Sequence, residues 1–434
     1  MNESGIVRDA PERQTGEPVT PSESRINEAA AFSPFVISLG KHPLWTQLLV
    51  ALVYVAMASV GLRFATFSQG VTLVWPPSGI GIAALLLFGT RVWPAIAVGS
   101  FCAAAIDGGS FMFAGITAAG NVLEAVFGAY VLRNATHFHC DLGRVRDVLG
   151  FLVLGVSVAA MIGATIGTLA VGADGTVPWT EAGRAWRTWW VADAMGILVM
   201  GALLLSWSVR SEQPWTSLRA VEAGALVLTL LPVVVLIYGG ILPAEFSHTL
   251  TFLTFPFVIW AALRFGQRGV TATVALTIAV AIWGTVRGVG PFADQAFNVA
   301  VVFFYGYTAA VGVTGLLLGA ATTERRRFAE ELQRIGFDLE IRVHERTAAL
   351  QEELTRRRQI QDDLQDALAS VKTLSGLLPI CSSCKRIRDD HGYWTQVERY
   401  LTEHTEAQFS HGLCPECFRE LYPEYMEKNG GRSR

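Results

Sequence analysis

The sequence of 434 residues is poor in charge: Asp, Glu, Lys and Arg make up 16% of it, where a soluble protein has about a quarter. Hydrophobic residues make up 51%, and the charged residues lie mostly before and after a long apolar part. This shortage of charge excludes an ordinary soluble globular protein and favours a membrane protein. The net charge of −3 is small and says little about partners, among which we expect no nucleic acid.

Several familiar motifs are also missing. The first 40 residues contain no basic segment followed by an apolar stretch and a small-residue cleavage site, so we expect no secretory signal peptide. Neither a glycine-rich phosphate-binding pattern in a strand-to-helix context nor the HExxH metal motif occurs. His344 lies on a charged segment with no nucleotide-binding segment after it, so we do not expect it to accept a phosphoryl group. These absences predict that the protein is not an enzyme.

The composition divides the chain into five parts. Residues 1–42 are rich in Pro, Glu, Ser and Thr and cannot bury enough apolar area to fold alone. We expect them to form a disordered cytoplasmic tail, with a second short tail at residues 429–434. The parts between the tails are residues 43–320, 321–376 and 377–428.

Residues 43–320 contain apolar runs of the length that a transmembrane helix needs, roughly 20 residues. We place ten of them, centred near Val53, Ala83, Val98, Val122, Ala159, Ile197, Leu230, Phe257, Leu276 and Ala310. The second and third are short and separated only by the sequence GTRVWP, which leaves open an arrangement of eight full spans with a tight or re-entrant pair. The predicted fold is an all-α polytopic membrane bundle of about 8–10 transmembrane helices.

Arginine is shared unevenly between the loops. With ten spans and a cytoplasmic N-terminus, every loop on the cytoplasmic side carries Arg, whereas the loops on the other side hold more acidic and fewer basic residues. Short cytoplasmic loops are enriched in Lys and Arg. We therefore expect a multi-pass protein of the cell inner membrane with both termini in the cytoplasm.

Residues 321–376 contain no Pro and many strong helix formers. Apolar residues recur with a heptad period: Val343, Leu350, Leu364, Val371 and Leu378 share one position, and Leu354 and Leu368 share its partner position. Arg357 and Gln361 interrupt the seam. The pattern predicts a cytoplasmic coiled-coil helix in a parallel homodimer. A monomeric amphipathic helix packed on a neighbour is the alternative.

Residues 377–428 carry four cysteines in two CxxC pairs, Cys381 with Cys384 and Cys414 with Cys417. Four thiolates suit one structural Zn²⁺, which prefers tetrahedral sulfur ligands, and a cytoplasmic location disfavours disulfides. Redox-active or unliganded cysteines are the alternatives. A complete set of four sulfur ligands leaves no open position for catalysis, and His411 could replace one sulfur. We expect a small zinc-binding α/β or α module with helices near residues 395–404 and after the second pair.

The remaining cysteines, Cys102 and Cys140, occur singly in or beside apolar segments, and we expect them to be packed or idle thiols.

Polar residues inside the apolar runs are candidates for a ligand site, since ionisable groups at membrane depth are costly. Glu124 and Asp193 are the acidic ones, and Asn121 lies near the first of them. The sequence WPPSG, which begins with Trp75, Pro76 and Pro77, breaks or starts a helix. These six residues could line a binding pocket, or their hydrogen bonds could only hold the bundle together. Trp186, Trp189 and Trp190 favour an interfacial aromatic belt.

Residues 72–101, together with NVLEA at Asn121, WWVADAMGILV at Trp189 and the long run from Pro256, resemble the integral membrane sensor domain of bacterial signalling proteins, the first type of the membrane-associated sensor families. The resemblance covers nearly all of residues 44–320. It implies a domain that senses an input and is fused to signalling outputs.

The cysteine-bearing tail is similar to a short module at the ends of bacterial sensory and receiver proteins. All four cysteines match its pattern, as do Gly392, Tyr393, Trp394 and the SHG at Ser410. Related chains usually carry a catalytic or ligand-binding domain between the two resemblances, whereas this chain has only the predicted coiled coil.

These patterns together predict a bacterial inner-membrane sensory protein. Its multi-span domain would pass an input through the coiled coil to the zinc-binding module, which would bind an unknown cytoplasmic signalling protein. Besides that protein, we expect membrane lipid and a second copy of the chain as partners. The alternative is a transporter or channel with a regulatory zinc-binding tail, in which Glu124 and Asp193 would bind ions or protons.

Overall fold

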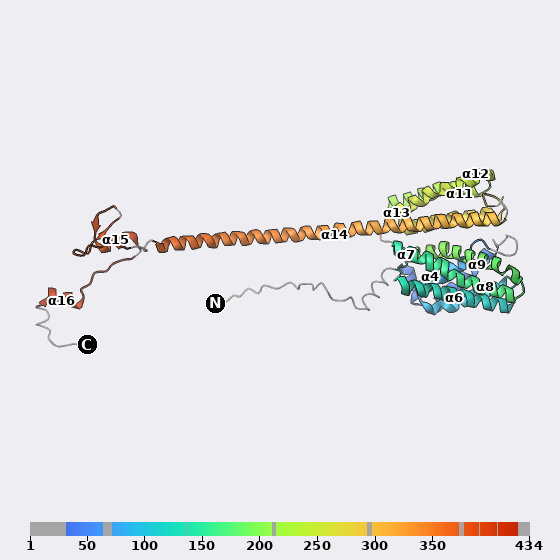
Figure 1. The fold of residues 1–434 in the computed structure, drawn as a ribbon, viewed down its shortest axis with the longest axis horizontal. Helices are drawn as coiled ribbons and strands as arrows, with labels where there is room; N and C mark the ends of the chain where they lie inside the picture. The colour runs from blue at the N-terminus through green and yellow to red at the C-terminus, as the bar shows by residue number, and fades with distance from the viewer. Residues whose placement is uncertain are drawn as a thin grey trace. The chain divides into compact units, whose positions relative to one another are not determined.

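The computed structural model describes residues 32–63, 72–136, 138–210, 214–292, 297–372, 377–389, 391–405 and 407–423. These residues are helical almost throughout (Figure 1). The chain divides into two units, Met1–Glu331 and Leu332–Arg434. The predicted tail at residues 429–434 and most of the predicted N-terminal tail lie outside the described residues.

The first unit contains every helix from α2 to the first part of α14. Its helices are α2 (Pro34–Gly40), α3 (Pro43–Arg63), α4 (Pro76–Phe88), η1 (Thr90–Val92), α5 (Trp93–Ile106), α6 (Phe111–Thr136), α7 (Val145–Gly150), η2 (Phe151–Ala159), α8 (Ala160–Ala173), η3 (Trp179–Glu181), α9 (Ala182–Gly196), η4 (Ile197–Gly201), α10 (Ala202–Ser208), α11 (Ser217–Tyr238), α12 (Ala244–Leu250), η5 (Thr251–Thr254), α13 (Phe255–Val286) and the first part of α14 (Phe297–Lys372). Two of these segments, η2 and η4, are π-helical and continue into α8 and α10.

Seven helices within the described residues are long and apolar enough to cross a membrane: Pro43–Arg63, Phe111–Thr136, Val145–Ala173, Trp179–Ser208, Ser217–Tyr238, Phe246–Val286 and Val302–Ala369. Two shorter apolar helices, Pro76–Phe88 and Thr90–Ile106, correspond to the second and third predicted runs. They are joined at Gly89, whose φ is 84°. Every predicted apolar run therefore lies on a helix, and the predicted all-α polytopic fold is confirmed.

One of the seven long helices, α13, reverses direction at Gly266, whose φ of 62° and ψ of −147° interrupt it. Before this glycine, Arg264 pairs with Glu222 near the start of α11. After it, Gly284 lies against the carbonyl oxygen of Tyr238 at the end of α11. The two halves of α13 therefore run antiparallel, which is why one long helix accounts for two predicted runs.

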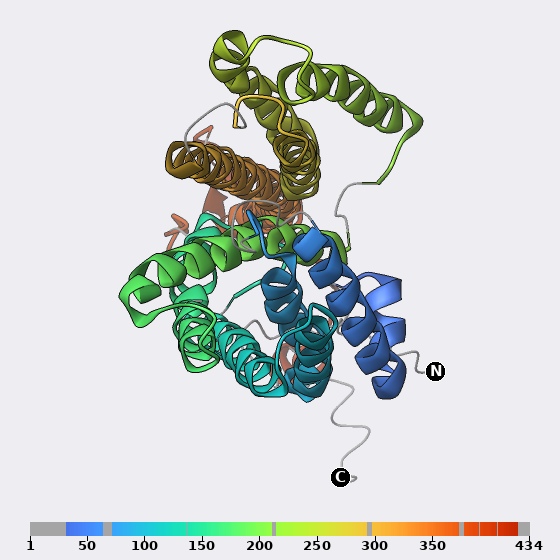
Figure 2. The same cartoon turned by 90° about the vertical axis from the view of Figure 1, so that its right-hand side faces the viewer.

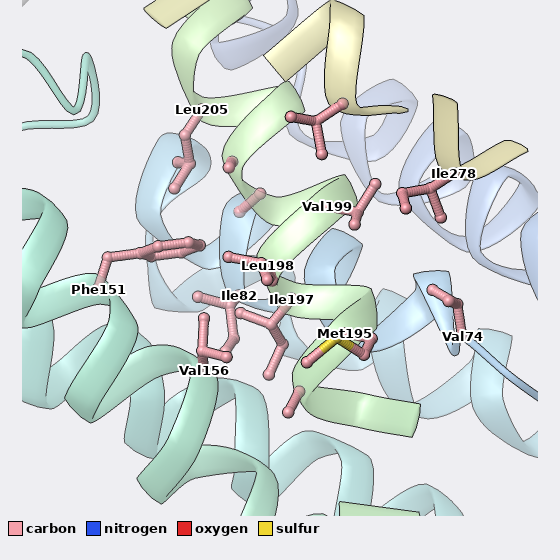
Figure 3. Packing of buried hydrophobic residues seen from close by; sticks show 14 of the residues in the cluster. Val74, Ile82, Phe151, Val156, Met195, Ile197, Leu198, Val199, Leu205 and Ile278 are labelled. Atoms are coloured by element: carbon pink, nitrogen blue, oxygen red, sulfur yellow. The ribbon is translucent and has the colours of Figure 1, made fainter. Parts of the chain in front are cut away.

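The core of the bundle lies between α4, η2 and the continuous helix formed by α9, η4 and α10. Ile82, Phe151, Ile197 and Leu198 are fully or nearly fully buried where these helices meet (Figure 3). The apolar window of Trp179–Ser208 is 61% buried, more than in any other of the seven helices. The corresponding share for Ser217–Tyr238 is 22%, so α11 faces outward with apolar side chains, as lipid requires.

The helices of the first unit form two groups. Figure 2 shows α3 to α10, coloured blue to green, as one group, with the yellow-green helices α11 to α13 beside it. Leu198 of η4 lies against Gly312 of α14, with its Cδ2 atom 3.0 Å from the position of a Cβ at that glycine. The helix that leaves the bundle therefore packs on the most buried helix within it.

The helix α14 is continuous over 76 residues, so the last apolar run and the predicted coiled-coil segment form a single helix (Figure 1). It ends at Lys372, and Leu378 lies outside it. The heptad position assigned to Leu378 is therefore wrong. Glu324 and Arg327 still contact the bundle at Val145 and Asp141, so the membrane unit extends past the predicted boundary at residue 320.

The predicted N-terminal tail is too long, because α2 occupies residues that the composition placed in it. Ser33 caps this helix by accepting a hydrogen bond from the Val36 backbone N–H, and Pro34 occupies the first turn, where its missing N–H has no consequence. The Ser33 N–H donates to the carbonyl of Ser208, 2.8 Å away, which ties the segment to the end of α10.

The second unit contains a small terminal module after α14. Its elements are the antiparallel strands β1 (Ile387–Arg388) and β2 (Trp394–Thr395), followed by α15 (Val397–His404) and α16 (Pro415–Leu421). Both predicted helices are present, and the hairpin gives the module α/β character.

Candidate functional site

The helix α4 begins inside the bundle rather than at its surface. Thr72, Leu73 and Val74 precede it as buried, non-helical residues, and the Trp75 N–H donates to the carbonyl of Ala192 over 2.9 Å. Pro76 and Pro77 cannot donate to a preceding turn, and a residue before proline is disfavoured in the helical region. The WPP sequence therefore places the start of α4 beside the middle of α9.

Small residues allow this close approach. A Cβ atom at Gly196 would overlap the carbonyl oxygen of Trp75, and one at Gly79 would overlap the backbone of Gly196 and Gly201. Only glycine lets the backbones of α4 and the α9–η4 helix touch here. The contact fixes where the side chains at the start of α4 point.

We predict that Gly196→Ala lowers the midpoint of thermal unfolding in detergent by several degrees, because overpacking costs about 1–3 kcal/mol and a backbone carbonyl cannot move as a side chain can. The matched control is Gly224→Ala on α11, where no atom lies within 4 Å of the added Cβ. The control should keep or slightly raise the midpoint. Equal midpoints for the two variants would refute the close contact.

Two buried carboxyl groups face each other beside this contact. Ser78 Oγ donates to Asp193 Oδ1 over 2.9 Å. Asp193 Oδ2 and both carboxyl oxygens of Glu124 have no hydrogen-bond partner among the described residues. A Cβ at Gly163 would overlap Glu124 Oε2 and lie 3.1 Å from Asp193 Oδ2, so both groups converge on this glycine of α8.

The carboxyl pair is almost completely buried, with Glu124 1% and Asp193 4% exposed. Buried charges without partners are strongly unfavourable. The pair is therefore suited to sharing protons or to meeting a cationic or hydrogen-bond-donating group.

Neutral polar groups continue the site toward α3 and α5. Asn121 Nδ2 donates to Ser100 Oγ over 2.7 Å. The hydroxyl groups of Tyr54, Thr117 and Thr168 are buried without a partner among the described residues. Such unpaired groups are rare in a packed interior, so these hydroxyls add hydrogen-bonding capacity around the carboxyl pair.

A cavity of about 450 Å³ leads from this cluster to one end of the bundle. Trp75, Asn121 and Asp193 line it together with residues at the ends of α3, α5 and α8. The volume suits a small-molecule ligand, since such sites occupy about 300–1,000 Å³.

The charge of this cavity is negative. Its described lining carries the carboxyl groups of Asp107, Asp174, Glu181 and Asp193 against the single basic residue Arg184. Ser110 and Thr176 donate hydrogen bonds that hold the pKa of the Asp174 carboxyl below its usual value, so it stays ionised. The Arg184 guanidinium lies 3.4 Å from Glu181. The cavity therefore favours a cationic ligand.

The structure brings four of the six predicted site residues together. Trp75, Asn121 and Asp193 line the cavity, and Glu124 lies behind Asp193. Pro76 and Pro77 set the start of α4 and do not line it. Trp189, which the sequence placed in an aromatic belt, also lines the cavity.

Sequence reasoning missed Ser78, Ser100 and Tyr54. Serine and tyrosine are common in membrane helices and do not stand out there. Only Ser78 lies in a motif that the sequence singles out, WPPSG.

The cysteine pairs lie in the terminal module on two tight backbone turns. The Lys385 N–H donates to the Cys381 carbonyl, and the Cys417 N–H lies 3.5 Å from the Cys414 sulfur at the start of α16. Backbone N–H groups directed at Cys381 and Cys414 lower the pKa of both thiols, which favours the thiolate that metals bind. Within the described residues, however, no group of three or more His, Cys, Asp or Glu side chains is arranged to hold a metal.

Comparison with known proteins gives one match. The model of MASE1, a membrane-associated sensor domain, matches residues 46–326, which is more than half of the chain. The match contains nearly all of α3, the helices up to the first part of α14 and the whole cavity described above, and it ends before the two CxxC pairs. No curated protein and no solved structure matches the chain.

Proposed function

The chain belongs to the MASE1 family of membrane-associated sensor domains, and from this premise we propose how it senses and signals. A multi-span helical protein with such a domain is a sensory membrane protein. We propose that the acidic cavity binds a small cationic ligand, and that binding changes the packing of α14. The continuous helix then carries the change to the terminal module, whose output is an interaction with a signalling protein rather than catalysis.

The observation that carries this proposal is the pair of buried carboxyl groups at the inner end of the cavity, of whose four oxygens only Asp193 Oδ1 has a hydrogen-bond partner among the described residues. Asp193 of α9 accepts a hydrogen bond from Ser78 at the start of α4. Little more than one turn after Asp193, on η4, Leu198 packs on Gly312 of α14. A ligand that neutralises Asp193 alters the contact between α4 and the α9–η4 helix. That helix touches α14 directly, so the change reaches the exit helix through packed side chains.

The distribution of arginine between the two ends of the bundle supports one orientation in the membrane. The end of the bundle where α14 leaves carries most of the loop arginines, and the acidic cavity opens at the other end. Cytoplasmic loops are enriched in Lys and Arg. We therefore propose an inner-membrane location in which the cavity faces away from the cytoplasm and the terminal module lies within it.

The test of the cavity uses purified full-length protein and a panel of small probes, namely alkali cations and alkylamines from methylammonium to spermidine. A bound probe at a hundred times its Kd stabilises the folded protein by about 2.7 kcal/mol. We expect at least one probe to raise the unfolding midpoint, and Asp193→Asn to abolish most of the shift.

The control is Asp338→Asn, which makes the same change on the exposed part of α14, where Asp338 pairs with Arg342. It should respond as the unmodified protein does. No shift with any probe, or an equal shift in Asp193→Asn, would contradict a cationic ligand at this site. Reconstitution in liposomes separates the transporter alternative, because a sensor should not move the stabilising probe across the membrane.

A further inference from the structure

A second and larger cavity lies at the end of the bundle where α14 leaves. Its volume is about 1170 Å³. Seven arginines line it: Arg133, Arg144, Arg210, Arg219, Arg268, Arg326 and Arg327. Asp141 is the only acidic residue among its described lining, and His139 also faces it.

The two cavities lie at opposite ends of the same helices. On α6, Phe113 lines the acidic cavity and Arg133 lines the arginine cavity. This separation along one helix corresponds to about 30 Å, the thickness of the hydrocarbon core of a bilayer. The arginine cavity is therefore a separate site, on the other side of the membrane from the acidic one.

Backbone carbonyl groups position several of the arginines. Arg133 Nη2 donates to the carbonyls of Leu85 and Leu86 at the end of α4, and Arg219 Nη2 donates to the carbonyl of Arg264. Arg268 likewise donates to two carbonyls near the end of α10. Carbonyl groups orient a guanidinium without cancelling its charge, and each guanidinium has five donors.

Carboxylates neutralise only part of this charge. Arg327 Nη2 lies 2.6 Å from Asp141 Oδ2, and Arg326 Nε lies 3.6 Å from Glu330. Nearby Glu324 accepts from the Val145 N–H at the start of α7, and Asp147 lies 3.4 Å from the His139 ring. The described residues around the cavity therefore keep a clear excess of positive charge in a partly enclosed space.

We propose that this cavity binds an anion carrying at least two phosphate groups, held between Arg326 of α14 and Arg144 of the segment before α7. The planar guanidinium group matches phosphate oxygens in pairs, and several such groups in one cavity suit a polyphosphate better than a single charge. The volume accommodates a ligand as large as a nucleotide. The ligand would join α14 to the bundle at the point where the signalling helix leaves it.

Two sources supply such a ligand, a soluble polyphosphate and the headgroup of a lipid with two phosphates such as cardiolipin. The first arm titrates full-length protein in nanodiscs of phosphatidylcholine alone with pyrophosphate, triphosphate and ADP. The second arm uses nanodiscs of phosphatidylcholine that also contain cardiolipin. Native mass spectrometry then compares how much of each lipid the protein retains. Binding in either arm fits the proposed chemistry and identifies the source.

The variant is Arg144→Gln with Arg326→Gln, and the matched control is Arg146→Gln with Arg325→Gln. Each double variant removes one arginine near the start of α7 and one on α14, but Arg146 and Arg325 do not line the cavity. We expect micromolar binding to the unmodified protein that weakens as salt is added. The cavity variant should bind at least tenfold more weakly and the control within twofold, with equal unfolding midpoints in the absence of ligand.

Two results would overturn the proposal. One is no binding of the soluble probes together with no preference for cardiolipin. The other is an equal loss of binding in both double variants, which would mean that the general positive charge of this face attracts anions. Both results leave the acidic cavity and its test unaffected.

Discussion

Replacing Cys414 by Ser in the full-length protein is expected to remove one bound zinc ion per chain and to unfold the terminal module. Of the described residues from 377 onward, only Ile387 and Tyr400 have buried apolar side chains. So small a core cannot stabilise a domain, and small domains of this kind depend on metals or disulfides. A structural zinc contributes on the order of 10–16 kcal/mol of apparent folding free energy.

Metal analysis and limited proteolysis check this prediction. The unmodified protein should contain one zinc and resist cleavage after α14, whereas Cys414→Ser and Cys381→Ser should lose both properties. Cys102→Ser, at the half-buried thiol of α5, is the control and should behave as the unmodified protein. Purified protein without zinc, or zinc that survives the loss of Cys414, would rule out a four-cysteine site.

The double variant Leu350→Lys with Leu364→Lys is expected to convert a dimer into a monomer. Leu350 and Leu364 are 61% and 59% exposed on α14, and Leu354 and Leu368 on the partner heptad position are 47% and 56% exposed. A leucine buried in a dimer seam contributes about 1.5–3 kcal/mol, and lysine at the same place adds a charge that cannot be buried. The heptad pattern fits best if this apolar stripe packs against α14 of a second copy of the chain.

The mass in detergent, measured by light scattering after correction for bound detergent, distinguishes the two states. Gln351→Lys with Gln365→Lys adds the same charges one residue away, off the apolar stripe, and should leave the dimer intact. The measurement would count against a coiled coil if the leucine variant kept the mass of the control, or if the unmodified protein were itself monomeric.

Features that depend on local sequence were predictable. The ten apolar runs and the uninterrupted exit helix were found because hydrophobicity and helix propensity belong to short stretches of chain. The prediction of a disordered N-terminal tail failed at α2, because a contact with a distant part of the chain stabilises this segment. The Ser33 N–H donates to the carbonyl of Ser208. The heptad position of Leu378 was wrong because a repeat does not reveal where a helix stops.

The sequence by itself determined that this is a polytopic helical membrane protein, that its last membrane helix can continue outward, and that Glu124 and Asp193 lie at membrane depth. Only the tertiary structure decided what those residues meet. Ser78 reaches Asp193 across 115 residues because glycine backbones bring α4 against α9, and seven scattered arginines share one cavity. Such contacts depend on how helices pack on one another, and no short stretch of sequence encodes that packing alone.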